Sequence, residues 1–298
     1  MLRHHTAASL IYLGLALITS AFVLLVATGE PVTLAPVWRG ESGWAPQPAG
    51  SAYPYEPRRG QAGKDVVWIP SDQAVVDTML DLAALTPEDA LLDLGSGDGR
   101  IVIGAARRGA PAVGVEYDPA LVDLSRHLAE KVGVSDRARF IHGDIFDTDL
   151  TQATVITMFL LPELNLRLRP SLLALGPGTR IVSNTFSMDD WLPDASATVR
   201  DGCQTWCVAL LWVVPANVEG VWQLDGARLT LRQRFQEVSG TLRGPGGDVT
   251  QVSGRLAGAT IRFRIGDLDY EGVVDGGSMQ GTIVSPGRHD LWQATHVR

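Results

Sequence analysis

The stretch LLDLGSGDGR, residues 91–100, decides how this chain folds. It begins as an apolar run typical of a buried parallel strand and continues into a turn with glycine at every second position, namely Gly95, Gly97 and Gly99. Glycine lets the backbone turn sharply and approach a ligand closely, because it has no side chain. Asp93 and Asp98 lie in the same stretch. The turn therefore predicts a ligand that tolerates both a tight glycine loop and the negative charge of these two carboxylates.

Strand and helix patterns alternate around this stretch. The strand patterns cover residues 90–94, 112–116, 138–142, 154–160 and 179–185, and the helix patterns cover residues 72–85, 100–108, 119–132 and 164–175. Such alternation predicts an α/β fold with a parallel, doubly wound, Rossmann-like sheet. After Pro215, eight short alternating segments separated by glycine-rich turns predict a small antiparallel β meander that can close into a barrel.

The first part of the 298-residue chain has a different character. Residues 7–28 are apolar and uncharged, and as a helix they would extend about 33 Å, enough for the ~30 Å hydrocarbon core of a membrane. We expect a transmembrane anchor, with a cleaved signal peptide as the alternative. The predicted organisation is an anchor or signal at residues 1–29, a Pro/Gly-rich linker at 30–64, a catalytic domain at 65–214 and a β-rich domain at 215–298.

Charge and cysteine content limit the function. The formal net charge is −8, and residues 64–214 hold 12 Lys and Arg against 21 Asp and Glu, so a nucleic acid partner is disfavoured. No cluster of His, Cys and Asp has the spacing of a metal site, so we expect no metal. The two cysteines, Cys203 and Cys207, would lie about 13 Å apart on an extended strand at ~3.3 Å per residue, which predicts structural thiols rather than a disulfide.

Three interpretations of the glycine turn compete: an ordinary tight turn, a dinucleotide site and an S-adenosylmethionine site. The spacing is G-x-G-x-G rather than G-x-G-x-x-G, and Asp93 and Asp98 would repel a pyrophosphate. The amino group and sulfonium of S-adenosylmethionine are cationic, so the same carboxylates favour it.

Carboxylates at two later strand ends fit the rest of that cofactor. Asp93 can hold its amino group, Glu116 can accept both ribose hydroxyls, and Asp144 can accept from the adenine amino group while the Ile145 amide bonds a ring nitrogen. The predicted cofactor-binding residues are Asp93, Gly95, Ser96, Gly97, Asp98, Gly99, Glu116, Tyr117, Asp144 and Ile145.

Several segments carry a family resemblance: WIPSDQAVVDTMLDLA, LLDLGSGDGRIVIGAA, VGVEYDP, FIHGDIFDTDL, FLLPELNLRLRPSLL and RIVSNTFSMDDW. From about Trp68 to Asp194 the chain resembles class I S-adenosylmethionine-dependent methyltransferases, and more narrowly the membrane-anchored, Dot-like protein-lysine methyltransferases. Their relatives include the mitochondrial ATP synthase c-subunit lysine methyltransferase. The resemblance implies N-methylation of a lysine on a membrane-associated protein. A methyltransferase acting on a quinone or lipid, and a binding protein with a relic cofactor fold, are the alternatives.

Methyl transfer needs orientation and desolvation of the acceptor more than a nucleophilic triad. The residues after the fourth strand face the reactive methyl group in this fold, and here they read FLLPELN. We expect Pro162 to shape this loop, Glu163 to orient the amine or take its proton, and Asn165 to hold the amine. Glu163 also fits an acidic residue in the first turn of a helix, so both interpretations stay open.

The cofactor also bears on location. It is made in the cytosol, whereas the charges flanking residues 7–28 are balanced and give no orientation. We therefore expect a single-pass protein of the inner (cytoplasmic) membrane, with residues 30–298 facing the cytoplasm.

Overall fold

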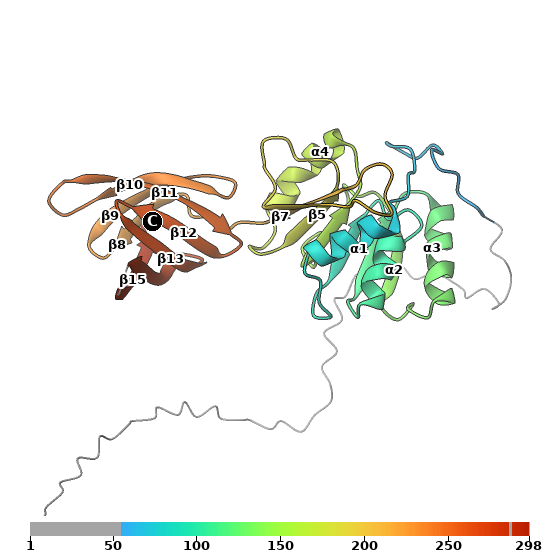
Figure 1. The fold of residues 1–298 in the computed structure, drawn as a ribbon, viewed down its shortest axis with the longest axis horizontal. Helices are drawn as coiled ribbons and strands as arrows, with labels where there is room; N and C mark the ends of the chain where they lie inside the picture. The colour runs from blue at the N-terminus through green and yellow to red at the C-terminus, as the bar shows by residue number, and fades with distance from the viewer. Residues whose placement is uncertain (1–54, 286–287, 298) are drawn as a thin grey trace, which may run out of the picture. The chain divides into compact units, whose positions relative to one another are not determined.

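The computed structural model describes residues 55–285 and 288–297 (Figure 1). The predicted anchor at residues 7–28 lies outside the described residues, as does most of the predicted linker at 30–64. The described chain forms a mixed sheet with helices on both faces, followed by a closed antiparallel barrel.

Within the described residues the sheet has seven strands in the order β3-β2-β1-β4-β5-β7-β6. β1 pairs in parallel with both β2 and β4, so the winding of the chain reverses at β1. In open α/β sheets ligands bind at such a switch point, beyond the carboxyl ends of the strands. The glycine turn follows β1 directly. The strands are β1 (Leu91–Leu94), β2 (Ala112–Glu116), β3 (Ala138–His142), β4 (Val155–Met158), β5 (Arg180–Asn184), β6 (Ala195–Thr198) and β7 (Val208–Val213).

Helices pack on both faces of this sheet, and Figure 1 shows α1, α2 and α3 close to one another. Leu91 belongs to the apolar cluster formed with α1, α2 and α3, whereas its neighbour Leu92 belongs to the cluster formed with α4. Successive residues of a strand point to opposite faces, so a strand covered on both faces is apolar throughout. The helices are α1 (Gln73–Leu82), α2 (Arg100–Arg107), α3 (Pro119–Lys131) and α4 (Pro162–Leu173).

The prediction of an alternating α/β order is confirmed between residues 72 and 185, where each element lies within three residues of its expected ends. The prediction of a purely parallel sheet is wrong at one edge. β7 pairs antiparallel with β5 and with β6, because the chain returns after β5 without a crossover helix. Antiparallel neighbours need no such helix, whereas parallel ones do.

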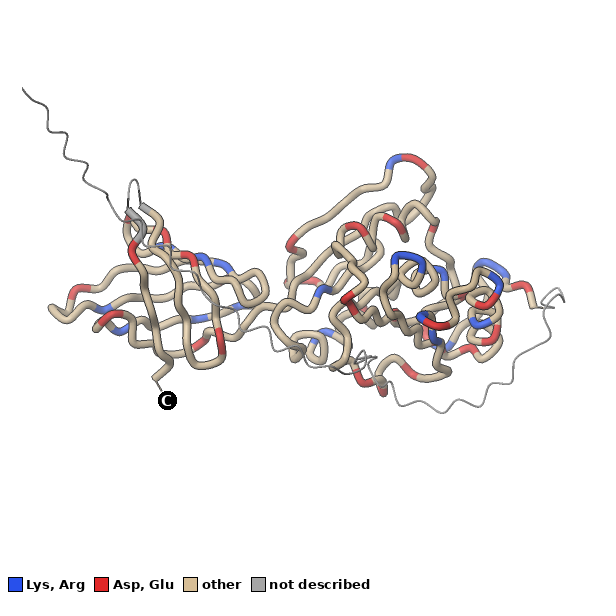
Figure 2. Tube along the Cα trace, turned by 90° about the horizontal axis from the view of Figure 1, so that it is seen from below, with Lys and Arg blue, Asp and Glu red and all other residues tan. Residues whose placement is uncertain are grey.

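The predicted meander is confirmed, and it closes into an eight-stranded antiparallel barrel in which β15 pairs with β8. Large side chains fill the interior, including Trp222, Phe263, Tyr270 and Trp292. Acidic and basic residues are interspersed along the barrel strands (Figure 2). The strands are β8 (Gly220–Leu224), β9 (Ala227–Arg234), β10 (Glu237–Arg243), β11 (Val249–Ala257), β12 (Thr260–Ile265), β13 (Leu268–Asp275), β14 (Ser278–Ser285) and β15 (Arg288–His296).

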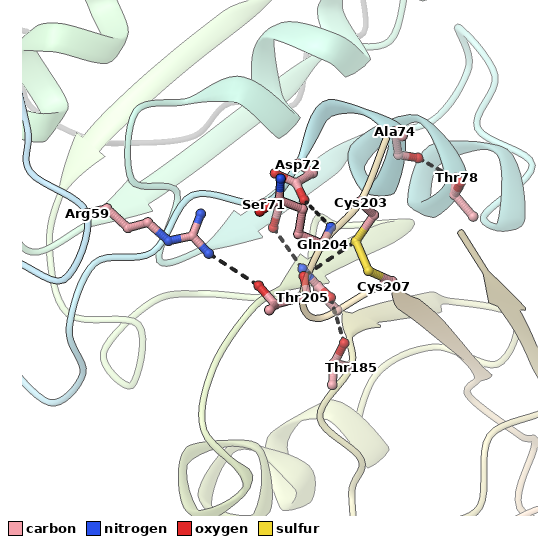
Figure 3. The surroundings of a disulfide bond; sticks show 11 residues. Arg59, Ser71, Asp72, Ala74, Thr78, Thr185, Cys203, Gln204, Thr205 and Cys207 are labelled. Carbon is pink, nitrogen blue, oxygen red and sulfur yellow. Dashed lines mark hydrogen bonds between the residues drawn. A yellow bond between two sulfur atoms is a disulfide. The ribbon is translucent and has the colours of Figure 1, made fainter. Parts of the chain in front are cut away.

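Cys203 and Cys207 form a disulfide, so the prediction of free thiols is wrong. Their Cα atoms are 5.8 Å apart rather than the distance expected on a strand. The prediction assumed extended backbone, but residues 199–207 form a loop that turns at Gly202 (φ +76°) and at Trp206 (φ +59°). Figure 3 shows the bridge next to the segment that leads into α1.

Among residues 55–285 and 288–297 there is no helix with the length and apolar character needed to cross a membrane. The longest of these helices, α3, has 13 residues and extends about 20 Å, less than the ~30 Å of a hydrocarbon core. The predicted single-pass placement in the inner membrane with residues 30–298 facing the cytoplasm therefore has no support in the described part of the chain, and its anchor at residues 7–28 lies outside that part.

Candidate active site

The glycine turn has a conformation that only glycine adopts easily. Gly95, Gly97 and Gly99 have φ values of +78°, +54° and +78°. A Cβ on Gly97 would lie 2.5 Å from Nε1 of Trp68, and one on Gly99 would lie 2.6 Å from Cε1 of Phe140. The turn therefore requires glycine for both its backbone geometry and its close packing.

Asp93 lies on β1 immediately before the turn and is 2% exposed. The Thr157 hydroxyl donates a hydrogen bond to Oδ1 of Asp93 over 2.7 Å. Burial, opposed by the hydrogen bond from Thr157 and assisted by the nearby charges of Glu116 and Asp98, raises the pKa of the Asp93 carboxyl to about 7. A cationic ligand group beside Asp93 would stabilise the ionised carboxyl and lower its pKa again.

Glu116 ends β2 and holds the glycine turn in place. Its Oε2 accepts from the Gly97 N–H at 2.9 Å, and its Oε1 accepts from the N–H groups of Tyr117 and Asp118 at 2.8 and 2.9 Å. A carboxylate has about four acceptor positions, so a ribose hydroxyl can still bind here.

Asp144 follows β3 and accepts from the Phe146 N–H at 3.0 Å. It is also paired with Lys64, whose ammonium holds the pKa of the Asp144 carboxyl below its usual range. The same ammonium lies 4.8 Å from the centre of the Tyr117 ring. A segment far away in the sequence thus reaches the carboxylate expected to bind adenine.

These residues surround a cavity of about 250 Å³. Nine of the ten predicted cofactor-binding residues line it, and Gly99 is the exception. Ser96 lines the cavity, and its hydroxyl is buried close to Gly114 with no hydrogen-bond partner within the described part of the chain. A buried carboxylate with a raised pKa and an unpaired hydroxyl beside a glycine turn fit an S-adenosylmethionine molecule.

Comparisons with known proteins support this assignment. Residues 93–195 match the family described as ANTKMT methyltransferase domain. A protein-lysine N-methyltransferase from Saccharolobus islandicus is 41% identical over 140 residues, which are 46% of this chain and 87% of that relative. The chain belongs to the protein-lysine N-methyltransferase family. Its cofactor is S-adenosyl-L-methionine.

Other similar proteins match over different shares of their length. The ATP synthase c-subunit lysine N-methyltransferase of Mus musculus is 41% identical over 116 residues, 39% of this chain and 46% of that relative. The methyltransferase therefore spans about half the length of that relative. A solved structure described as an RNA methyltransferase from Salinibacter ruber with S-adenosyl-L-homocysteine is 45% identical, covers 50% of this chain and 96% of that chain, and has a TM-score of 0.47.

The three predicted catalytic residues of the methyltransferase lie outside the cavity lining, although Leu161 and Leu164 beside them belong to it. Pro162 and Glu163 are exposed in the first turn of α4. Asn165 is fully buried and donates from Nδ2 to the backbone oxygens of Phe186 and Ser187 at 3.1 and 3.3 Å. Asn165 thereby fixes the backbone of the loop after β5.

Sequence reasoning missed two contributions to the cavity. Residues 61–71 line the cavity, with Trp68 against the glycine turn, and the aromatic residues Phe159, Phe186 and Trp206 line it as well. The segment WIPSDQ was a usable signal for the first, since it resembles the family. No local pattern marks Trp206. Among the described residues no group of His, Cys, Asp and Glu could hold a metal ion.

Proposed function

We propose that this methyltransferase N-methylates a lysine of a membrane-associated protein. The observation that carries the proposal is one cavity whose lining has two chemically different parts. The lining combines carboxylates and a glycine turn, which we assign to one end, with Phe159, Leu160, Leu161 and Leu164, which we assign to the other. Relatives named for the ATP synthase c-subunit and for adenine nucleotide translocase, both membrane proteins, support the class of acceptor.

The carboxylate end would hold the cofactor. In this proposal Asp93 binds its amino group, Glu116 a ribose hydroxyl, and Asp144 with the Ile145 amide the adenine. Asp144 must then share its carboxylate between Lys64 and the ligand. Ser96 would supply a further hydrogen bond, since its hydroxyl is buried without a partner among the described residues.

The apolar end would prepare the acceptor. When bound, S-adenosylmethionine supplies a methyl group on a sulfonium, and its transfer to a lysine amine leaves S-adenosylhomocysteine and a methylated lysine. The amine must first lose a proton, because its unperturbed pKa is about 10.4. A low-dielectric environment lowers that pKa by disfavouring the ammonium, so Phe159 and the three leucines would favour the reactive form.

The role of Glu163 stays a prediction. Taking the amine proton from its exposed position would require the acceptor to reach the start of α4. If Glu163 does so, Glu163→Gln lowers kcat about 100-fold while cofactor affinity is unchanged. A loss below about threefold assigns Glu163 to the first turn of α4, where an acid stabilises the helix.

The proposed function can be tested with the purified protein and tritium-labelled S-adenosylmethionine. Purified ATP synthase c-subunit, a membrane protein extract, a lipid and quinone extract, and total RNA serve as four separate acceptors. We expect label on protein, and mass spectrometry should place the added methyl on a lysine. Label confined to lipid or quinone, or to RNA, would contradict the proposed acceptor class.

A further inference from the structure

Three aromatic residues line the same cavity as the predicted cofactor-binding residues. Phe159 follows β4, Phe186 follows β5, and Trp206 precedes β7. The rings of Phe159 and Phe186 stack with their centres 5.8 Å apart, and Trp206 meets Phe159 edge-on at the same separation. Together these three residues form an aromatic wall.

The aromatic wall adjoins the glycine turn. Leu160, next to Phe159, lies so close to the turn that a Cβ on Gly95 would be 3.2 Å from its Cδ2. The backbone of Phe186 is held by two hydrogen bonds, because its oxygen accepts from the Ser183 hydroxyl at 2.7 Å and from Nδ2 of Asn165 at 3.1 Å. The wall is thus a preformed surface beside the cofactor residues.

Trp206 has a backbone conformation that needs support. Its φ of +59° lies in the left-handed region, which is unfavourable for a bulky side chain. Such conformations persist only where the surroundings impose them, and they concentrate at ligand-binding sites.

The support comes from the Cys203–Cys207 disulfide, which closes a short loop containing Trp206. The loop is tied to the start of α1, since the Gln204 N–H donates to Oδ2 of Asp72 at 3.3 Å (Figure 3). On the other side, the Val199 N–H donates to the Cys207 oxygen at 2.8 Å. Breaking the disulfide would free Trp206 to leave the left-handed region and move away from Phe159.

The wall already has a cation next to it. The guanidinium carbon of Arg59 lies 5.6 Å from the centre of the Trp206 ring, and Nη2 of Arg59 donates to the Thr205 hydroxyl at 3.3 Å (Figure 3). The electron-rich face of tryptophan attracts cations at this range. A lysine side chain offers the same combination of an apolar stem and a cationic head.

We propose that Phe159, Phe186 and Trp206 bind the side chain of the acceptor lysine, and that the Cys203–Cys207 disulfide positions Trp206 for this contact. The inference rests on the proposed function, because it specifies where the acceptor binds. The lysine stem packs along the aromatic wall and its ammonium is attracted to the ring of Trp206. The ammonium gives its proton to solvent water, and the neutral amine then enters the apolar end beside Phe159.

The first test compares Trp206→Ala and Trp206→Phe in the full chain. We expect Trp206→Ala to raise the KM for the c-subunit acceptor about tenfold, the order of a cation–π contact, and Trp206→Phe to restore most of the loss. The Kd for S-adenosylhomocysteine, measured by calorimetry, should change less than about twofold in both. Leu192→Ala, at an exposed site, is the control for a general effect of substitution. An unchanged acceptor KM in Trp206→Ala, or an equal loss of cofactor affinity, would overturn the proposal.

The second test addresses the disulfide. The variant carrying Cys203→Ser and Cys207→Ser should show the same rise in acceptor KM with unchanged affinity for S-adenosylhomocysteine. Adding Trp206→Ala to it should cause little further loss, because both changes act through one contact. Dithiothreitol should reproduce the effect in the unmodified protein and have none on the double serine variant. Independent, additive losses would show that the disulfide stabilises the fold without positioning Trp206.

A third measurement separates this proposal from the proposed function. Binding of Nα-acetyl-lysine methylamide in the presence of S-adenosylhomocysteine should quench tryptophan fluorescence, and its uncharged norleucine analogue should bind less tightly. Loss of this discrimination in Trp206→Ala, measured by calorimetry because the reporting ring is absent, supports the wall even if no protein acceptor is methylated. Label on a lysine together with equal binding of both probes would support the function and contradict the wall.

Discussion

The Thr157 hydroxyl donates to Oδ1 of Asp93 across directly paired positions of β4 and β1, and both side chains are buried. The bond fixes the carboxylate at the point where the sheet reverses its winding. It also partly offsets the cost of an ionised group in the protein interior. The protein therefore holds a costly negative charge where the cationic part of its cofactor is expected.

Cofactor affinity should depend on pH through Asp93. Its pKa is raised to about 7, so in the cofactor-free protein the Asp93 carboxyl is largely protonated below neutral pH. The cationic amino group of the cofactor favours the ionised carboxylate. The Kd for S-adenosylhomocysteine should rise as the pH falls below about 7, approaching tenfold per pH unit. Calorimetry across that range measures this change. Asp93→Asn should bind weakly at every pH, and a flat profile in the unmodified protein would contradict the assignment of Asp93.

The same residue should make the cofactor-free protein less stable. The folded-state pKa of Asp93 lies above its unfolded value of 3.8, so stability is lost as the pH rises from about 4 to about 7 and is then constant with respect to this group. Asp93→Asn should therefore stabilise the cofactor-free protein near pH 8, by at most about 4 kcal/mol, and have little effect near pH 4. Urea unfolding at the two pH values measures this, with the exposed Asp123→Asn as control. Destabilisation near pH 8 would show that the carboxylate is favourably paired.

Gly97→Ala and Gly133→Ala form a matched pair. Both glycines have positive φ, +54° and +72°, but an added Cβ meets Trp68 only at Gly97, while nothing lies within 4 Å at Gly133. Gly133→Ala should cost about 1 kcal/mol of stability and leave cofactor affinity unchanged. Gly97→Ala should cost more and weaken S-adenosylhomocysteine binding at least tenfold, since the turn must shift. Equal behaviour of the two variants in calorimetry and urea unfolding would refute the role of close packing.

Glu116→Ala should affect both the turn and the cofactor. It removes the acceptor of three backbone N–H groups, from Gly97, Tyr117 and Asp118. We expect a loss of about 1–3 kcal/mol in stability and a similar loss in cofactor binding. Glu116→Gln retains one acceptor oxygen and should lose less of each. A normal affinity in Glu116→Ala would remove this residue from the cofactor site.

The fold around the glycine turn was predictable because its signals are local. Apolar runs and helical periodicity depend on which faces of each element are buried, and they can be detected along the chain. The carboxyl ends of parallel strands meet at one edge of a sheet, so chain order was enough to bring Asp93, Glu116 and Asp144 together. The structure confirms that these three residues line one cavity.

Predictions from the sequence are wrong where a local pattern is compatible with more than one backbone path. The spacing of Cys203 and Cys207 predicts thiols on an extended segment, whereas that segment lies in a loop with Trp206 in the left-handed region and its two cysteines form a disulfide. No strand is predicted from the sequence at β7, and the alternating elements predict a parallel sheet, whereas β7 pairs antiparallel with β5 and no crossover helix precedes it. Neither error involved the hydrophobic pattern. Both concerned the path of a connection.

The sequence alone determined the α/β order, the requirement for glycine at Gly95, Gly97 and Gly99, and the chemistry of a cofactor that carries positive charge. Only the tertiary structure decided which aromatic residues lie beside that cofactor site. Phe159, Phe186 and Trp206 follow or precede three different strands, and no spacing in the sequence relates them. Their meeting depends on the pairing of β4, β5 and β7 and on a disulfide-closed loop, that is, on contacts between distant segments that form only when the whole sheet has folded.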